Sequence, residues 1–169
     1  DVRPMSYLRA LFFVLAMLAT FGSMAGEPAH SDSGRDQVIR QILSDFWGNA
    51  KDVHGNAIQP ASQEDRATVP ISRAAAYRAL EAGNLSGLAE WCGLDWEQHY
   101  LGLTEEARKM GMLDKQVAFF SVLHGAGQGA MVGSRSGQTC TAKQRTRIET
   151  LLLESQKEGL PSDALNGWQ

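Results

Sequence analysis

The chain has 169 residues, 43% of them apolar and 21% charged, a composition that fits one globular domain and excludes a disordered or collagen-like protein. Its 16 basic and 19 acidic residues give a net charge of −3, which disfavours nucleic-acid binding. The two cysteines are too few for a zinc site built from cysteine alone.

The N-terminal segment has the pattern of a secretory signal peptide. Met5 is the expected start, and we interpret residues 1–4 as upstream translation or a remnant. An uncharged apolar run at 10–21 follows, and the small residues Ser23 and Ala25 favour cleavage after Ala25. The run is shorter than the roughly 20 residues of a membrane-spanning helix. We therefore expect no stable membrane anchor after cleavage.

Cleavage would leave residues 26–169 as a single domain with a net charge of −4, because two arginines and one aspartate are removed. We expect this product in a bacterial periplasm, or secreted by a eukaryotic route. In an oxidising compartment Cys92 and Cys140 should form a disulfide, the alternative being two free thiols. Closing a loop of this length stabilises the fold by about 4 kcal/mol in the chain-entropy model.

Helical patterns separated by polar segments fill the rest of the chain. Apolar residues from Val38 to Trp47 recur at helical spacing, with Asp32 or Ser33 as the cap and Gly48 as the end. The polar segment 49–70 is expected to be a loop with a turn or brief hairpin at 53–58, and loops this long often serve a function.

The next patterns predict two helices with a further short turn between them. Ser72 should cap a short helix that ends at Gly83, and a further short turn should lead to Cys92. Asp95 should cap a helix that ends at Gly111, with Tyr100, Leu103 and Ala107 on its inner side.

The C-terminal third predicts two more helices. Asp114 should cap the most apolar helix, 115–131, and a glycine-rich turn should follow at 133–137. Thr141 and Gln144 form a capping box for a last helix closed by Gly159. No segment alternates with a period of two, so we expect an all-α bundle of about five or six helices.

Candidate chemistry rests on few residues. Asp95 and His99 are four apart, so they can meet on one helix face, and with His124 they are the candidate acid–base or ligand group. The alternative is an aspartate cap and a partly exposed imidazole. No motif of a catalytic nucleophile or metal site is present, so we assign no catalytic residue, metal or cofactor. Trp91-Cys92-Gly93 lacks the second cysteine of a redox motif.

His124 lies in the most apolar helix, and we expect it in the core, bonded to a backbone carbonyl, rather than in a cleft. Gly125 and Gly129 are four apart on one helix face, which would permit close approach of another helix.

The C-terminal half resembles the Rap/Tai type of periplasmic immunity protein from type VI secretion systems. The similarity covers His124-Gly125-Ala126-Gly127-Gln128-Gly129, then Cys140-Thr141, then an amphipathic helix from Lys143 to Glu154. The resemblance implies a small exported helical protein that binds a cell-wall-cleaving toxin and blocks its active site. Residues 90–96 and the loop 49–70 depart from the family pattern, so no functional residue is carried over.

These observations favour a non-catalytic periplasmic protein that binds or inhibits another protein. The alternatives are a small periplasmic hydrolase or metal-dependent enzyme that uses His124, His99 and Asp95, and a structural or stress protein of the cell envelope.

Overall fold

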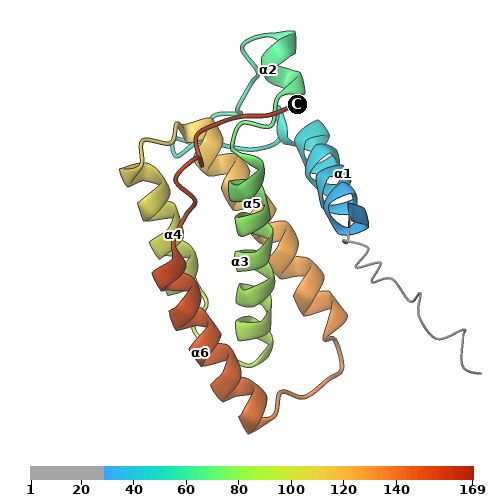
Figure 1. Cartoon of the computed structure of the whole chain (residues 1–169), viewed down its shortest axis with the longest axis vertical. Helices are drawn as coiled ribbons and strands as arrows, with labels where there is room; N and C mark the ends of the chain where they lie inside the picture. The colour runs from blue at the N-terminus through green and yellow to red at the C-terminus, as the bar shows by residue number, and fades with distance from the viewer. Residues whose placement is uncertain (1–28) are drawn as a thin grey trace, which may run out of the picture.

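The computed structural model describes residues 29–169, which form one small domain of six helices (Figure 1). The expected signal peptide, residues 1–25, lies outside these described residues. Within the described part of the chain no strand forms, and the all-α prediction of five or six helices is confirmed. The helices are α1 (Ala29–Phe46), α2 (Gln63–Ala67), α3 (Arg73–Trp91), α4 (Glu97–Lys109), α5 (Asp114–Ser134) and α6 (Ala142–Glu158).

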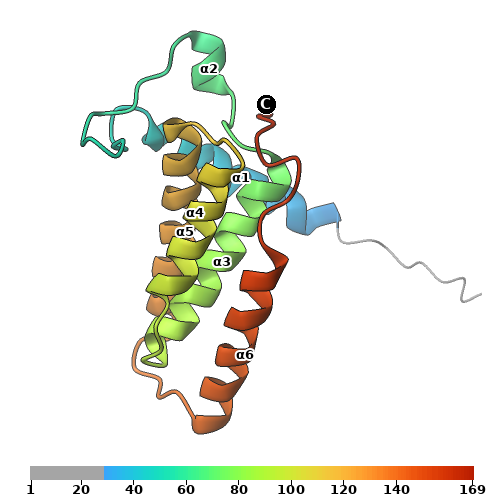
Figure 2. The same ribbon diagram turned by 90° about the vertical axis from the view of Figure 1, so that its left-hand side faces the viewer.

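The centre of the domain is α3, which packs most extensively against α5 and also contacts α4 and α6 (Figures 1 and 2). The helices α3 to α6 run alternately down and up the long axis, while α1 lies beside α5. The main core joins all of these except α6, with Phe46 of α1 in edge contact with Phe119 of α5. No helix in residues 29–169 combines the length and apolar character that a membrane crossing requires.

Several expected helix ends are confirmed. The Ser72 hydroxyl accepts the Ala75 N–H, and Thr141 and Gln144 form the reciprocal capping box. Gly48 and Gly159 have φ angles of +85° and +66°, a left-handed conformation that stops a helix because other residues rarely adopt it.

Three predicted boundaries are wrong. Gly83 does not end a helix, because α3 continues unbroken to Trp91 and Gly83 instead gives room for the backbone of α5. The helix α1 begins at Ala29, before the expected caps, which places Asp32 in a first turn that favours negative charge. Asp114 is the first residue of α5 rather than its cap, and the Gln116 side chain accepts the Leu113 N–H instead.

The polar segment 49–70 contains the predicted turn and a helix that was not predicted. Lys51 and Ala57 form an isolated antiparallel bridge, and the Asp52 carboxylate accepts the N–H groups of residues 54 and 56. The unpredicted helix is α2, which Ser62 caps.

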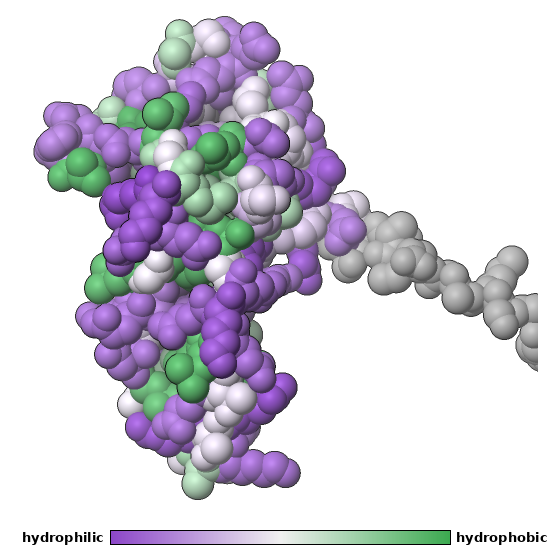
Figure 3. Space-filling view, turned by 60° about the vertical axis from the view of Figure 1, so that its left-hand side comes forward, coloured by the Kyte–Doolittle hydropathy of each residue, from purple (hydrophilic) through white to green (hydrophobic). Residues whose placement is uncertain are grey.

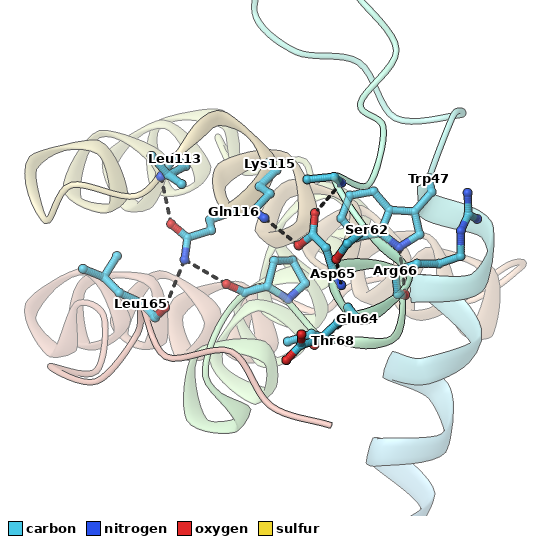
Figure 4. A network of polar contacts seen from close by, with 12 residues as sticks. Trp47, Ser62, Glu64, Asp65, Arg66, Thr68, Leu113, Lys115, Gln116 and Leu165 are labelled. Atoms are coloured by element: carbon cyan, nitrogen blue, oxygen red, sulfur yellow. Dashed lines mark hydrogen bonds and ion pairs between the residues drawn. The ribbon is translucent and has the colours of Figure 1, made fainter.

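Polar contacts attach α2 and the C-terminal segment to the start of α5 (Figure 4). Lys115 Nζ lies 2.6 Å from Asp65 Oδ1, and Gln116 Nε2 donates to the carbonyls of Pro70 and Leu165. Trp47 Nε1 donates to the Arg66 carbonyl. The long loop is therefore anchored to the bundle through α5 and through Trp47, which directly follows α1.

The predicted disulfide between Cys92 and Cys140 is present, with the two Cα atoms 5.2 Å apart. It joins the end of α3 to the segment before α6, within a second apolar cluster that contains Ala89 and Ile148. Arg145 reinforces this junction by donating to the Cys92 carbonyl at 2.9 Å.

Candidate functional site

Two of the three candidate residues meet in the interior of the bundle. The Ser86 hydroxyl on α3 lies 2.9 Å from His124 Nε2 on α5 and 3.2 Å from His99 Nδ1 on α4. These side chains are 0–2% exposed. The core position of His124 is therefore confirmed, although its partner is a serine hydroxyl rather than a backbone carbonyl. The alternative of a partly exposed His99 is wrong, because that imidazole lies on the same inner face as Leu103 and Ala107.

The hydrogen bonds continue from His99 to α6 and back to α3. His99 Nε2 lies 2.8 Å from the Ser155 hydroxyl, and Arg78 Nη2 donates to that same hydroxyl at 2.7 Å. Arg78 also donates to the carbonyls of Ser155 and Gly159. We call the five side chains Arg78, Ser155, His99, Ser86 and His124 the polar chain.

We assign the protons of the polar chain starting from Arg78, because a guanidinium can only donate whereas a serine hydroxyl can both accept and donate. Ser155 accepts from Arg78, so its own hydrogen is available to His99 Nε2. His99 then carries its proton on Nδ1 and donates it to Ser86, which donates to His124 Nε2. We infer that both imidazoles are neutral and that each uses Nε2 as an acceptor.

The surroundings favour this neutral state. Burial, together with a smaller contribution from the Arg78 charge, lowers the pKa of His99 from 6.5 to about 4. Burial also lowers the pKa of His124 to about 4, with a smaller contribution from His99. The His124 ring additionally contacts Tyr100, with ring centroids 4.8 Å apart.

Glycines bring α3 and α5 close enough for the short Ser86–His124 bond. A Cβ on Gly83 would collide with the His124 carbonyl, and one on Gly87 would lie 2.6 Å from the Gln128 carbonyl oxygen. A Cβ on Gly127 would lie 2.5 Å from the Leu80 carbonyl oxygen. The prediction that Gly125 and Gly129 serve this helix contact is wrong, because neither has a neighbour within 4 Å of an added Cβ.

Asp95 is not part of the polar chain. Its exposed carboxylate accepts the N–H groups of Glu97 and Gln98, which makes it a cap of α4 as one alternative predicted. His54 is exposed in the turn of the loop 49–70. Within residues 29–169 no group of three or more His, Cys, Asp or Glu side chains has the arrangement of a metal site.

A serine hydroxyl 2.9 Å from an imidazole has the spacing of a nucleophile and its base. Here both groups are fully buried, and Ser86 is bonded to two imidazoles at once. The arrangement ties four helices together, and a substrate would reach it only if helices moved apart. Its evident role is to fix the packing of the bundle.

The sequence reasoning did not single out the outer face of α5. From Val122 to Gly133 the exposed positions of this helix carry no charged or polar side chain; they are Val122, Gly125, Ala126, Gly129, Ala130 and Gly133. We call these six residues the α5 outer face. By contrast, the face of the domain where α4 and α6 lie is mostly hydrophilic, with small separate hydrophobic patches (Figure 3).

A surface pocket of about 340 Å³ adjoins this face at Val122. Val117 and Ala118 of α5 line one side, and residues 50–53 of the loop line another. Tyr100 of α4 also lines the pocket, where its hydroxyl donates to Ser121. The pocket therefore extends the α5 outer face toward the loop.

Comparisons with protein-family models, with curated protein sequences and with solved structures find no match to this chain.

Proposed function

We propose that this chain is an exported, non-catalytic binding protein that acts by contact with another protein, and that the α5 outer face is its contact surface. The observation that carries the proposal is the absence of charge along this exposed face. A helix on the surface of a soluble protein normally has polar residues opposite its buried stripe, whereas a helix that is apolar all round is normally covered. In α5 from Val122 to Gly133 the outer face is apolar or small, and the buried positions of the inner face are apolar or small except for His124.

The composition of the α5 outer face favours a helix of the partner as its occupant. Its inner face already shows how small residues act, because Gly83, Gly87 and Gly127 let the backbones of α3 and α5 approach closely. The outer face offers Gly125 and Gly129 at the same spacing of four, with nothing within 4 Å of an added Cβ. A partner helix can therefore approach this side as closely as α3 approaches the other.

The disulfide is compatible with an oxidising compartment, which supports the proposal of a periplasmic or secreted protein. Within that proposal, the resemblance to Rap/Tai immunity proteins supplies the kind of partner: a cell-wall-cleaving toxin whose active site is blocked. The competing proposal of a small hydrolase or metal-dependent enzyme would place activity at His124, His99 and Asp95.

The test uses residues 26–169 as bait in periplasmic extract, with recovery of a specific, saturable partner as the expected result. Gly129→Glu should abolish this capture, because it places a charge in the centre of the α5 outer face. Gly102→Glu is the matched control, since Gly102 is an exposed glycine of α4 that also has nothing within 4 Å of an added Cβ.

Capture that is equal for Gly129→Glu and Gly102→Glu would contradict the assignment of the surface. Repeated failure to recover any partner, together with turnover of a substrate that His124→Gln abolishes, would favour the enzyme instead.

A further inference from the structure

The helix α6 is attached to the bundle mainly by polar contacts. Among its residues only Ile148 and Ser155 are buried. The disulfide and Arg145 hold its N-terminal end, and beyond its C-terminal end Ala164 O accepts the Ser72 N–H at 3.1 Å. Between these two fixed points, Ser155 bonds His99 and Arg78, and Arg78 also donates to the Ser155 and Gly159 carbonyls. The same stretch is held by the Leu160 N–H bond to Glu106 and by packing of Leu152 on the second apolar cluster.

We propose that the polar chain is an acid-sensitive clasp: protonation of His99 or His124 breaks the bonds through the serine hydroxyls and releases the second half of α6 from α3 and α4. This inference does not depend on the proposed binding role. It follows from the burial of two imidazoles whose hydrogen-bond partners are neutral serine hydroxyls and whose nearest buried charge is the guanidinium of Arg78.

A proton added to His99 Nε2 would make that atom a donor toward Ser155, which already accepts from Arg78. The Ser155 hydrogen would then have no acceptor in the polar chain, and a second positive charge would be buried beside Arg78. A proton added to His124 Nε2 would oppose the Ser86 hydrogen in the same way. Buried donors without acceptors and buried like charges are both strongly unfavourable.

The charged groups around the imidazoles do not offset this cost. On α3, the charged side chain that faces the imidazoles is Arg78, which is 8% exposed. On α4, Glu106 accepts the Leu160 N–H, and on α6 Glu158 lies 3.9 Å from Arg78 at a 69% exposed site. The only charged residues of α5, Asp114 and Lys115, lie at its N-terminus. None of these carboxylates bonds an imidazole.

The size of the effect follows from linkage between proton binding and opening. A histidine with a pKa of 6.5 in the released state and about 4 in the closed state shifts the opening equilibrium roughly 60-fold toward release at pH 4.5, relative to pH 7. The clasp is therefore closed above pH 6.5 and weakens progressively below it.

The test is amide hydrogen exchange of the protein with its disulfide intact, at pH 7 and pH 4.5, corrected for the intrinsic exchange rates. We expect residues 152–160 to exchange tens of times faster at pH 4.5, while the amides at the α3–α5 contact remain the more strongly protected. The double variant His99→Gln and His124→Gln keeps an acceptor for each serine but cannot be protonated in this range, so its exchange should not depend on pH. His54→Gln, an exposed control, should behave as the unaltered protein.

Equal protection of 152–160 at both pH values in the unaltered protein would overturn the proposal. So would acid-induced loss of protection in every helix together, because that outcome is global unfolding. If the double variant does not fold, the measurement on the unaltered protein alone decides.

Discussion

The two faces of α5 predict opposite effects for the same substitution at glycines two residues apart. Gly127→Ala adds a Cβ 2.5 Å from the Leu80 carbonyl oxygen and 3.1 Å from the Asn84 nitrogen, both backbone atoms of α3. Gly129→Ala adds a Cβ in open space. Neither glycine has a positive φ angle, so alanine fits the helical backbone at both sites.

The magnitudes come from two opposing terms. Replacing glycine by alanine inside a helix stabilises it by about 0.5–1 kcal/mol. At Gly129 nothing opposes this gain. At Gly127 the helices must separate, and overpacking of this kind costs about 1–3 kcal/mol, with strain on the Ser86–His124 bond in addition. We therefore expect the free energy of unfolding to rise by up to about 1 kcal/mol for Gly129→Ala and to fall by about 1–2 kcal/mol for Gly127→Ala.

Urea denaturation followed by circular dichroism at pH 7 measures both values on the oxidised protein. Gly125→Ala is a second control, because its Cβ also meets open space. If Gly127→Ala stabilised the protein as much as Gly129→Ala does, the close packing of α3 on α5 described above would be incorrect.

Three further predictions concern the polar chain, the disulfide and α2. The pKa values of His99 and His124 are lower in the folded state than the ordinary 6.5, so the unfolded chain binds more protons in acid. The free energy of unfolding should therefore keep its full value above pH 6.5 and fall by about 3 kcal/mol per histidine as the pH approaches 4. Urea titrations at several pH values would detect this fall. Replacing Cys92 and Cys140 together by serine should lower the free energy of unfolding by about 4 kcal/mol, given their separation of 48 residues, and an unchanged denaturation midpoint would refute this. Asp65→Asn should weaken the partly buried bond to Lys115 and lower the free energy of unfolding by about 1 kcal/mol. Amide exchange should become faster only in α2 and the loop 49–70, and no change at those amides would contradict the role of Asp65 in anchoring α2 to α5.

The helical class could be predicted because periodicity and capping residues are local signals, and the disulfide because the chain has only two cysteines to pair. The helix boundary placed at Gly83 was wrong for a physical reason. Glycine is a weak helix former, so it suggests an end, but here the contact with α5 requires a residue without a side chain. Only the tertiary structure distinguishes these two uses of glycine.

The polar chain was predicted in part. Asp95 and His99 were paired because they are four apart, although the carboxylate caps its own helix and the imidazole points inward. The spacing of His99, Leu103 and Ala107 is the local signal that indicates a buried imidazole. Ser86 and Ser155 carry no such signal, since a serine in a helix is unremarkable until its partner on another helix is known.

The most direct test of the account is the protonation state of the imidazoles, measured by ¹⁵N NMR of the histidine rings between pH 7 and pH 5. The account predicts that His99 and His124 are neutral at pH 6, with the proton on Nδ1 and Nε2 as the acceptor in both rings. The exposed His54 ring provides the solvent-accessible reference. A charged His99 or His124 at pH 6 would contradict the neutral, hydrogen-bonded chain on which the account depends. A proton on Nε2 in either neutral ring would contradict the direction that we infer for its hydrogen bonds.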